Sequence, residues 1–438
     1  MPATSLRLKD LLTPCTPEEF FQDTWERTPL AIARGNEGHY AGLLSLRDFD
    51  QVIAFSRPRF NDPAAFQTTS PVRPTYVRGA LDHASMSAAD EPGIAELRQA
   101  FDQGKSLVIM AMQRRWPAIA ELCRNLEGVF RCPVHANMYL TPPGSQGFAA
   151  HYDPHEVFIL QLEGSKDWRL YGASEELPLV SDGTGVPRQP LGPSREVRLS
   201  PGDLLYIPRG HVHEAFTVDS LSLHLTVGIN VYRWSDLLRH ALAAASREDV
   251  RFRESLPEGA LPANKGQLRQ HFQDLLDRLV ENAAGNDLFD KALESLGNQF
   301  FHQLPMLPGS RFAPPADLDQ FTLETVLENR AYPLCRVVDD DSGVAIEFPG
   351  NRVGGPQRIA PALRFVAGVR RFVVRALPDD LNPQAKLVLA RRLVREGLLT
   401  VVEEPAQIVN RTSDNAVSLP EDASTAPTVV WETLEPAR

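Results

Sequence analysis

Between Val134 and Val231 the chain alternates short apolar runs with turn signals. The clearest turns are Pro201-Gly202-Asp203 and Pro208-Arg209-Gly210, because proline fixes φ and glycine accepts positive φ. Regularly spaced strands with such punctuation are typical of a β-sandwich or barrel. The predicted strands are Ala136–Leu140, Glu156–Leu162, Asp167–Tyr171, Glu196–Leu199, Asp203–Ile207 and Ser220–Val231.

After Tyr232 the composition changes to helix-forming residues, and three helices are predicted: Trp234–Ser246, Lys265–Ala283 and Asp287–Gln303. A last mixed unit follows a proline-rich joint. Its predicted elements are a helix Leu318–Asn329, two strands around Asp339-Asp340-Asp341-Ser342-Gly343, a helix near Ile359–Val366, a strand Arg371–Ala376, a helix Asn382–Glu396 and the run Leu398–Val402. Helices followed by a short hairpin resemble a winged helix.

These patterns predict a mixed α and β chain with four parts. The first covers residues 1–233, with its barrel core at about 134–231. A helical segment then covers 234–305, and a winged-helix-like domain covers 314–404. The polar, acidic stretch 405–438 is expected to be disordered.

Composition and charge narrow the class of protein. The 438 residues carry a formal charge of −11, which argues against a protein that coats nucleic acid and suits a basic polypeptide partner. The four cysteines contain no CxxC pair, so neither a zinc site nor a disulfide framework is indicated. Neither a signal peptide nor a stretch able to cross a membrane is evident. We therefore expect a cytoplasmic protein that makes no membrane contact.

One group of residues has the chemistry of a metal centre. His151 and Asp153 stand two positions apart in an extended segment, so their side chains project to the same side. His213 follows the turn at Pro208 and precedes the last barrel strand. Two imidazoles and one carboxylate on one face of a barrel form the facial triad that holds non-haem Fe(II) and leaves positions open for catalysis.

Two other histidines could replace members of this triad. His155 shares strand parity with His151 and Asp153, although Pro154 disturbs ideal extension. His211 shares parity with His213 and could be the distal ligand instead. Both alternatives remain open on spacing alone.

Polar residues recur at every second position of two predicted strands, so their side chains share one face of each strand. This pattern indicates a partly polar cavity beside the metal centre. Asn137, Tyr139 and Thr141 share one face of the strand before the triad. His224 and Thr226 share one face of the last barrel strand. Lys166 follows the turn Glu163-Gly164-Ser165 and is either an exposed turn lysine or an inward cation. A buried ammonium needs a compensating anion, so an inward Lys166 would favour an anionic co-substrate.

Several stretches resemble the JmjC-type ribosomal oxygenases, a family of cupin-fold protein hydroxylases that depend on Fe(II) and 2-oxoglutarate. The resemblance is densest over residues 134–231. It is carried by 137–148 (NMYLTPPGSQGF), His151-Tyr152-Asp153, 158–166 (FILQLEGSK), 206–215 (YIPRGHVHEA) and 222–226 (SLHLT). It implies a double-stranded β-helix (cupin/JmjC) barrel, a helical dimerisation segment over 234–305 and a C-terminal winged-helix-like domain.

The resemblance also assigns roles to residues. His151, Asp153 and His213 would bind Fe(II), and Lys166 would pair with the distal carboxylate of 2-oxoglutarate. Asn137, Tyr139, His224 and Thr226 would line the co-substrate pocket. The arginine-hydroxylating branch of the family has arginine at the position of Lys166 and the histidine-hydroxylating branch has lysine, which leans towards the second branch without fixing the target.

The function predicted on these grounds is Fe(II)- and 2-oxoglutarate-dependent hydroxylation, with O2, of a histidine or arginine side chain in a protein, most simply a basic ribosomal protein. The expected oligomer is a homodimer, without direct binding to nucleic acid. Two alternatives stand beside it: an oxygenase that tailors a peptide or small molecule, and a non-catalytic binding or regulatory protein on the same barrel.

Overall fold

The computed structural model describes residues 6–56, 67–68, 94–179, 185, 187, 190–256, 265–306, 318–340 and 343–402. The predicted disordered tail, 405–438, lies outside these residues. The chain divides into two compact units, of which one contains Met1–Asn230 and the other is Val231–Glu404. The helical and winged-helix-like segments predicted from the sequence both fall in the second unit.

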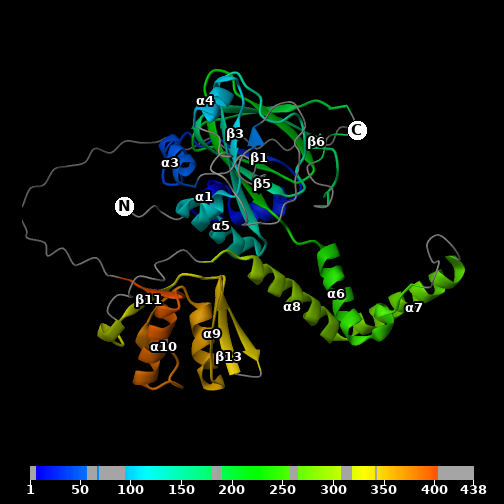
Figure 1. Cartoon of the computed structure of the whole chain (residues 1–438), viewed down its shortest axis with the longest axis vertical. Coiled ribbons are helices and arrows are strands. Elements are labelled where there is room, and N and C mark those ends of the chain that lie inside the picture. The colour runs from blue at the N-terminus through cyan, green and yellow to red at the C-terminus, as the bar shows by residue number, and fades with distance from the viewer. Residues whose placement is uncertain are drawn as a thin grey trace, which may run out of the picture. The chain divides into compact units, whose positions relative to one another are not determined.

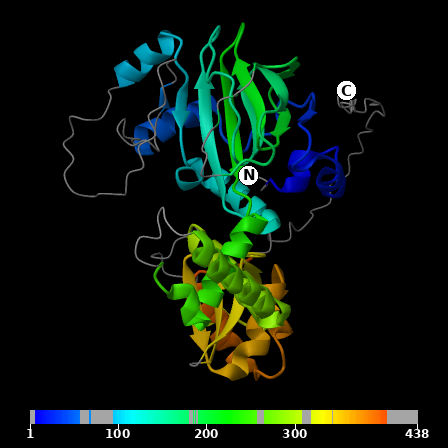
Figure 2. The ribbon, with the colours of Figure 1, turned by 90° about the vertical axis from the view of Figure 1, so that its right-hand side faces the viewer.

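The first unit is built from two antiparallel sheets (Figures 1 and 2). A seven-stranded sheet has the order β1-β8-β5-β10-β4-β3-β2, and a three-stranded sheet has the order β7-β6-β9. The strands are β1 (Leu30–Ile32), β2 (Gln67–Thr68), β3 (Leu107–Ile109), β4 (Val134–Thr141), β5 (Glu156–Gly164), β6 (Lys166–Ala173), β7 (Arg195–Leu199), β8 (Leu204–Ile207), β9 (His211–Phe216) and β10 (Ser222–Ile229). The mixed α and β class with antiparallel sheets is confirmed.

The core of this unit lies between the two sheets. Alternate residues of β5, such as Val157 and Ile159, pack against Trp168 and Leu170 of β6. The intervening residue Phe158 points to the opposite face, because side chains alternate along a strand, and there its ring contacts Phe20, Phe130 and Tyr206. Both faces of β5 are therefore covered, which explains its continuous apolar run.

The N-terminal region is largely helical, and Phe20 of its π-helical turn and Phe130 of its last helix contribute to that second layer. Its helices are α1 (Leu8–Leu12), α2 (Pro17–Glu19) with a π-helical turn Phe20–Thr24, α3 (Leu46–Ser56), α4 (Ile94–Asp102) and α5 (Pro117–Phe130). Thr16 caps α2 by accepting a hydrogen bond from the Glu19 N–H while the Glu19 carboxylate accepts from the Thr16 N–H. This reciprocal cap fixes the entry of the chain into the aromatic layer around Phe20.

The second unit begins with three long helices, α6 (Trp234–Glu248), α7 (Lys265–Ala284) and α8 (Asn286–Gln303). Two three-stranded antiparallel sheets follow, with the orders β15-β11-β16 and β12-β13-β14. Their elements are β11 (Val326–Asn329), β12 (Arg336–Asp340), β13 (Gly343–Phe348), β14 (Asn351–Gly355), α9 (Ala360–Gly368), β15 (Arg371–Val373), α10 (Pro383–Arg395) and β16 (Leu399–Val401). Helices α9 and α10 share one apolar core with these strands.

The predicted helix Leu318–Asn329 is wrong. Only Leu318–Gln320 is helical, as a short 3-10 turn, and Val326–Asn329 forms β11. β11 is the central strand of its sheet and bonds to β15 and β16 on its two sides. These contacts with residues distant in sequence outweigh the helix propensity of the segment.

Candidate metal and dicarboxylate site

The three predicted metal ligands lie on two neighbouring segments: the edge strand β9 of the three-stranded sheet, and the segment that pairs with β9. His213 lies on β9, opposite Leu170 of β6. On the other side of β9, residue His151 forms a β-bridge with His213, so the segment before β5 extends the sheet. Asp153 follows two residues later. The structure therefore brings together residues that lie far apart in the sequence.

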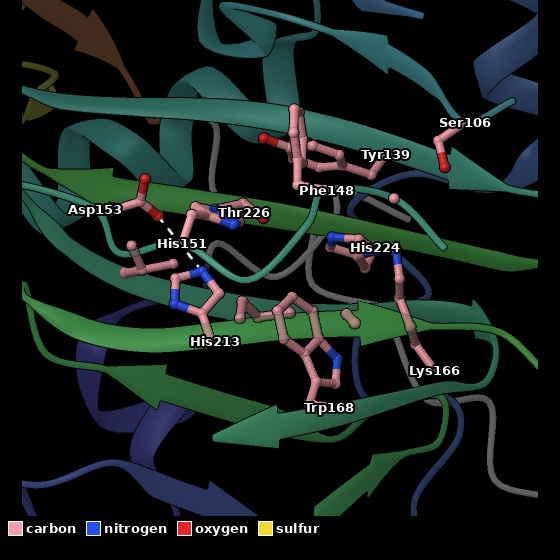
Figure 3. A pocket seen from close by; sticks show the side chains of 14 residues that line it. Ser106, Tyr139, Phe148, His151, Asp153, Lys166, Trp168, His213, His224 and Thr226 are labelled. Atoms are coloured by element: carbon pink, nitrogen blue, oxygen red, sulfur yellow. Dashed lines mark ion pairs between the residues drawn. The ribbon is translucent and has the colours of Figure 1, made fainter. Parts of the chain in front are cut away.

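The side chains of His151, Asp153 and His213 converge (Figure 3). One nitrogen or oxygen from each lies within 4.8 Å of the others, and Nε2 of His213 is 3.7 Å from Oδ2 of Asp153. The rings of His151 and His213 are 4.5 Å apart, centroid to centroid. These are the donor types of a facial triad for Fe(II).

Backbone carbonyls fix which nitrogen of each imidazole faces the centre. Nδ1 of His151 is 2.8 Å from the carbonyl oxygen of Ala149, and Nδ1 of His213 is 3.0 Å from that of His211. A carbonyl only accepts, so Nδ1 of each ring donates to it, and Nε2 is the nitrogen of each ring that is left to bind a metal. Outer partners of this kind orient metal-binding histidines.

The charges of the cluster also suit a cation. Burial lowers the pKa of His213 to about 4, with a further contribution from His151. Burial alone would raise the pKa of Asp153, but the imidazoles of His155, His151 and His213 outweigh it and hold that pKa below its ordinary value. Near neutral pH the cluster thus offers a neutral imidazole and a carboxylate anion, the protonation states that metal binding needs.

The alternative ligand His155 does not join this cluster among the described residues. Its ring lies edge-on to that of His135, 4.9 Å away between centroids. His211 is likewise outside the cluster, since its carbonyl rather than its ring approaches His213.

A cavity opens beside the cluster, and its far end is marked by Lys166 (Figure 3). Lys166 is 3% exposed, and burial lowers its pKa to about 7. Within the described residues the hydrogen-bond acceptor of its ammonium is the hydroxyl oxygen of Thr141, at 2.9 Å, and no carboxylate pairs with it. The exposed-lysine alternative is thus excluded, and the cavity can hold an anion.

The wall between these ends is formed by a cross-strand pair. Tyr139 of β4 lies directly opposite His224 of β10, and their rings stack 4.8 Å apart. A bulge between β5 and β10 falls at Leu223/His224, which re-aims this part of β10. Nδ1 of His224 is buried without a hydrogen-bond partner in the described part of the chain. Such an orphan atom fits a cavity that receives a polar ligand.

Of the other two predicted pocket residues, one lines the cavity and one does not. Thr226 lines the cavity with Tyr139 and His224. Asn137 lies opposite Thr226 on β4 but is not among the lining residues, and its amide oxygen accepts a hydrogen bond from the Ala111 N–H at 3.1 Å. Asn137 thus holds the turn after β3, where Ala111 has a positive φ of 56°.

Seven lining residues were not predicted as site residues from the sequence: Ser106, Gly147, Phe148, Val157, Ile159, Trp168 and Ala215. Trp168 stands two positions after Lys166 on β6, so strand parity could have found it. Phe148 meets the ring of His151 edge-on, with 5.5 Å between centroids. Ser106 precedes β3, and nothing in its local sequence signals that the fold brings it to Lys166.

Comparison with known proteins identifies the class. Residues 109–237 match the model of the JmjC domain. The chain is 32% identical to Ribosomal oxygenase 1 of Gallus gallus over 91% of this chain and 72% of that protein. It is also 32% identical to the bifunctional lysine-specific demethylase and histidyl-hydroxylase NO66 of Drosophila persimilis, over 68% of this chain and 44% of that protein.

Solved structures agree in fold. The X-ray structure of E. coli YcfD matches with a TM-score of 0.53 and 17% identity, covering 89% of this chain and 98% of that one. YcfD in complex with cobalt and 2-oxoglutarate matches with a TM-score of 0.50 and 20% identity, covering 88% and 97%. The chain belongs to the JmjC ribosomal oxygenase family. It is accordingly a 2-oxoglutarate-dependent oxygenase of the class that uses Fe(II).

Proposed function

We propose that this protein hydroxylates a histidine or arginine side chain of a ribosomal protein. The observation that carries the proposal is the convergence of His151, Asp153 and His213 beside a cavity closed by the buried cation Lys166. The names of the relatives, ribosomal oxygenase and histidyl-hydroxylase, support a ribosomal substrate. The target favoured is histidine rather than arginine, because Lys166 matches the lysine of the histidine-hydroxylating branch and one relative is named a histidyl-hydroxylase.

In this proposal the metal ligands are Nε2 of His151, Nε2 of His213 and the carboxylate of Asp153. Fe(II), when bound, couples oxidative decarboxylation of 2-oxoglutarate to activation of O2 for insertion into a C–H bond. Ala149 and His211 hold the two imidazoles through their carbonyls. The protein's own contribution is this fixed donor set, the anchoring of the co-substrate and the exclusion of water.

The co-substrate pocket in this proposal extends from the metal centre to Lys166. Lys166 pairs with the distal carboxylate, and Tyr139, His224 and Thr226 form the wall along the carbon chain. Asn137 stands opposite Thr226 outside the cavity lining, and it supports this wall from behind by accepting a hydrogen bond from the Ala111 N–H. The aromatic rings of Tyr139, Phe148 and Trp168 restrict water at the cavity.

The second unit is proposed to be a dimerisation module followed by a winged-helix-like domain. Apolar side chains recur at helical spacing on α6 and remain exposed in the single chain: Trp234 is 80%, Leu238 64% and Leu242 45% exposed. Similar exposed residues occur on α7 and α8: Phe272, Leu276, Val280, Phe289 and Leu293. Apolar patches of this kind mark protein interfaces, and a second copy of the chain is the proposed partner.

Two further predictions stay open. The formal charge of −11 suits a basic protein substrate rather than nucleic acid. No helix in the described part of the chain is long and apolar enough to cross a membrane. A cytoplasmic location remains a prediction.

The test is intact-mass comparison of ribosomal proteins from cells with and without this protein. Loss of one oxygen atom from a single ribosomal protein in the deletion strain, restored by the purified enzyme with Fe(II) and 2-oxoglutarate, is expected. Unmodified ribosomes together with turnover of a free peptide or metabolite would support a tailoring oxygenase instead. Absence of both iron binding and 2-oxoglutarate turnover would support the non-catalytic alternative.

A further inference from the structure

Two buried donors converge on one neutral oxygen at the end of the cavity. The Lys166 ammonium donates to Oγ1 of Thr141 at 2.9 Å, and the Ser106 hydroxyl donates to the same oxygen at 3.0 Å. Ser106 is 1% exposed and Thr141 is fully buried. Ser106 and Lys166 both line the cavity, whereas Thr141 stands behind them.

Two donors directed at one point bind a carboxylate more strongly than they bind the single hydroxyl oxygen of Thr141. A hydrogen bond to a carboxylate is roughly twice as strong as one between neutral groups. The ammonium has three protons and a hydroxyl proton rotates freely about its C–O bond. Both donors can therefore turn from Thr141 to a carboxylate oxygen without movement of the backbone.

The space for that carboxylate is bounded by Gly147. A Cβ built on Gly147 would lie 3.9 Å from Nζ of Lys166 and 3.9 Å from Oγ of Ser106. Gly147 also lines the cavity, and its N–H is hydrogen-bonded to the carbonyl of Ala215 on β9. The absence of a side chain at this position thus keeps open the volume in front of both donors.

We propose that Ser106 binds the distal carboxylate of the dicarboxylate co-substrate together with Lys166, and that Gly147 leaves the space this carboxylate fills. This inference rests on the proposed function. It adds Ser106, from the segment before β3, as a second hydrogen-bond donor beside Lys166 on β6. The pair selects a 2-oxo acid that ends in a carboxylate over one that ends in a methyl group.

The experiment measures binding without turnover. The full-length protein, loaded anaerobically with Fe(II), is titrated with 2-oxoglutarate while the visible charge-transfer band of the iron–keto-acid complex is followed. The same titration is made with 2-oxobutanoate, which is 2-oxoglutarate without its distal carboxylate. Ser106→Ala is compared with wild type and with Ser145→Ala, which removes another buried hydroxyl that bonds the Pro143 carbonyl outside the cavity lining.

The expected result is a 2-oxoglutarate Kd about 10- to 100-fold higher for Ser106→Ala, the range for losing one hydrogen bond to a charged group. Its Kd for 2-oxobutanoate should stay at the wild-type value, as should both constants for Ser145→Ala. Gly147→Ala should also weaken 2-oxoglutarate at least about tenfold, because its methyl group enters the carboxylate space, and should spare 2-oxobutanoate.

A wild-type Kd for 2-oxoglutarate in Ser106→Ala would overturn the inference, as would equal losses for both acids, which would indicate a general structural defect. If Ser106→Ala does not fold, Gly147→Ala provides the same discrimination, and equal losses for the two acids there would also overturn the inference. A wild-type protein that gives no charge-transfer band with either acid would contradict the proposed function itself.

Discussion

The backbones of His151 and His213 are joined by two hydrogen bonds, 3.1 Å from the His151 N–H to the His213 carbonyl and 2.8 Å in the reverse direction. In such an antiparallel pair the two side chains stand on the same face of the sheet. The imidazoles are therefore brought together by the sheet itself, and Asp153 reaches the same point by strand parity.

Asp153→Asn should abolish tight metal binding. The amide retains the shape of the side chain but removes the charge, so Co(II) affinity measured by calorimetry is expected to fall more than the roughly 10- to 100-fold typical of an outer partner. His155→Asn is the matched control, because His155 packs against His135 rather than joining the cluster. An equal loss in the control would reinstate His155 as a ligand.

Affinity for 2-oxoglutarate should depend on pH through Lys166. Burial lowers the pKa of Lys166 to about 7 in the free protein, so the ammonium is present below pH 7 and is lost as the pH rises. A bound dicarboxylate stabilises the charged form. The apparent Kd should therefore increase about tenfold per pH unit above 7, with proton uptake on binding.

Calorimetry in buffers of different ionisation enthalpy measures that proton uptake. Lys166→Met should bind 2-oxoglutarate weakly and lose this pH dependence. The neighbouring His224 does not produce the effect, because burial and the charge of Lys166 hold its pKa well below the ordinary value. A flat wild-type profile between pH 7 and about 9 would contradict the assignment of Lys166 as the titrating anchor.

Gly210→Ala should damage both stability and metal binding. Gly210 has a φ of 83°, and a Cβ there would lie 1.9 Å from the carbonyl oxygen of Glu175. Its N–H also donates to the Asp153 carbonyl at 2.9 Å, so displacement of this turn moves a proposed ligand. We expect a loss above about 3 kcal/mol in the free energy of unfolding, from overpacking and backbone strain together.

Gly397→Ala is the control for that strain. Gly397 has a φ of 87°, and no atom of the described residues lies within 4 Å of a Cβ added there. It should lose only the roughly 1 kcal/mol due to the left-handed backbone. If urea unfolding gives equal losses in the free energy of unfolding for Gly210→Ala and Gly397→Ala, the collision with Glu175 has no effect.

Arg209→Met should destabilise the first unit. Arg209 is 6% exposed, its Nε is 3.3 Å from Oε1 of the fully buried Glu156, and its Nη2 is 2.5 Å from Oε1 of Glu26. Removing one member of a buried pair typically costs about 3–5 kcal/mol. The control Arg98→Met breaks an exposed pair with Asp102 and should change the free energy of unfolding by less than about 1 kcal/mol.

Charge on the exposed face of α6 should prevent dimer formation. Leu238→Asp together with Leu242→Asp places two carboxylates on the proposed interface. Light scattering after size exclusion should show a dimer for wild type and a monomer for the double variant. Lys291→Asp, which changes an exposed charge that bonds Glu248, is expected to remain dimeric. A monomeric wild type would remove the dimer proposal.

The sequence by itself determined the donor types and much of the framework. Short apolar runs separated by turn signals located six barrel strands. The parity of His151 with Asp153 and of His224 with Thr226 is a local property of an extended chain. β9 (His211–Phe216) was missed because its polar residues hide the strand pattern, although it carries His213.

Only the tertiary structure decided which distant groups meet. The pairing of β9 with His151 selected His213 over His211, and the packing of the barrel brought Ser106 to Lys166 and turned the Asn137 amide towards Ala111. β11 is a strand because it lies between β15 and β16, not because Val326–Asn329 favours one. The residue type determines what a side chain can bind. Which group it does meet depends on hydrogen bonds and packing between segments that lie far apart in the sequence.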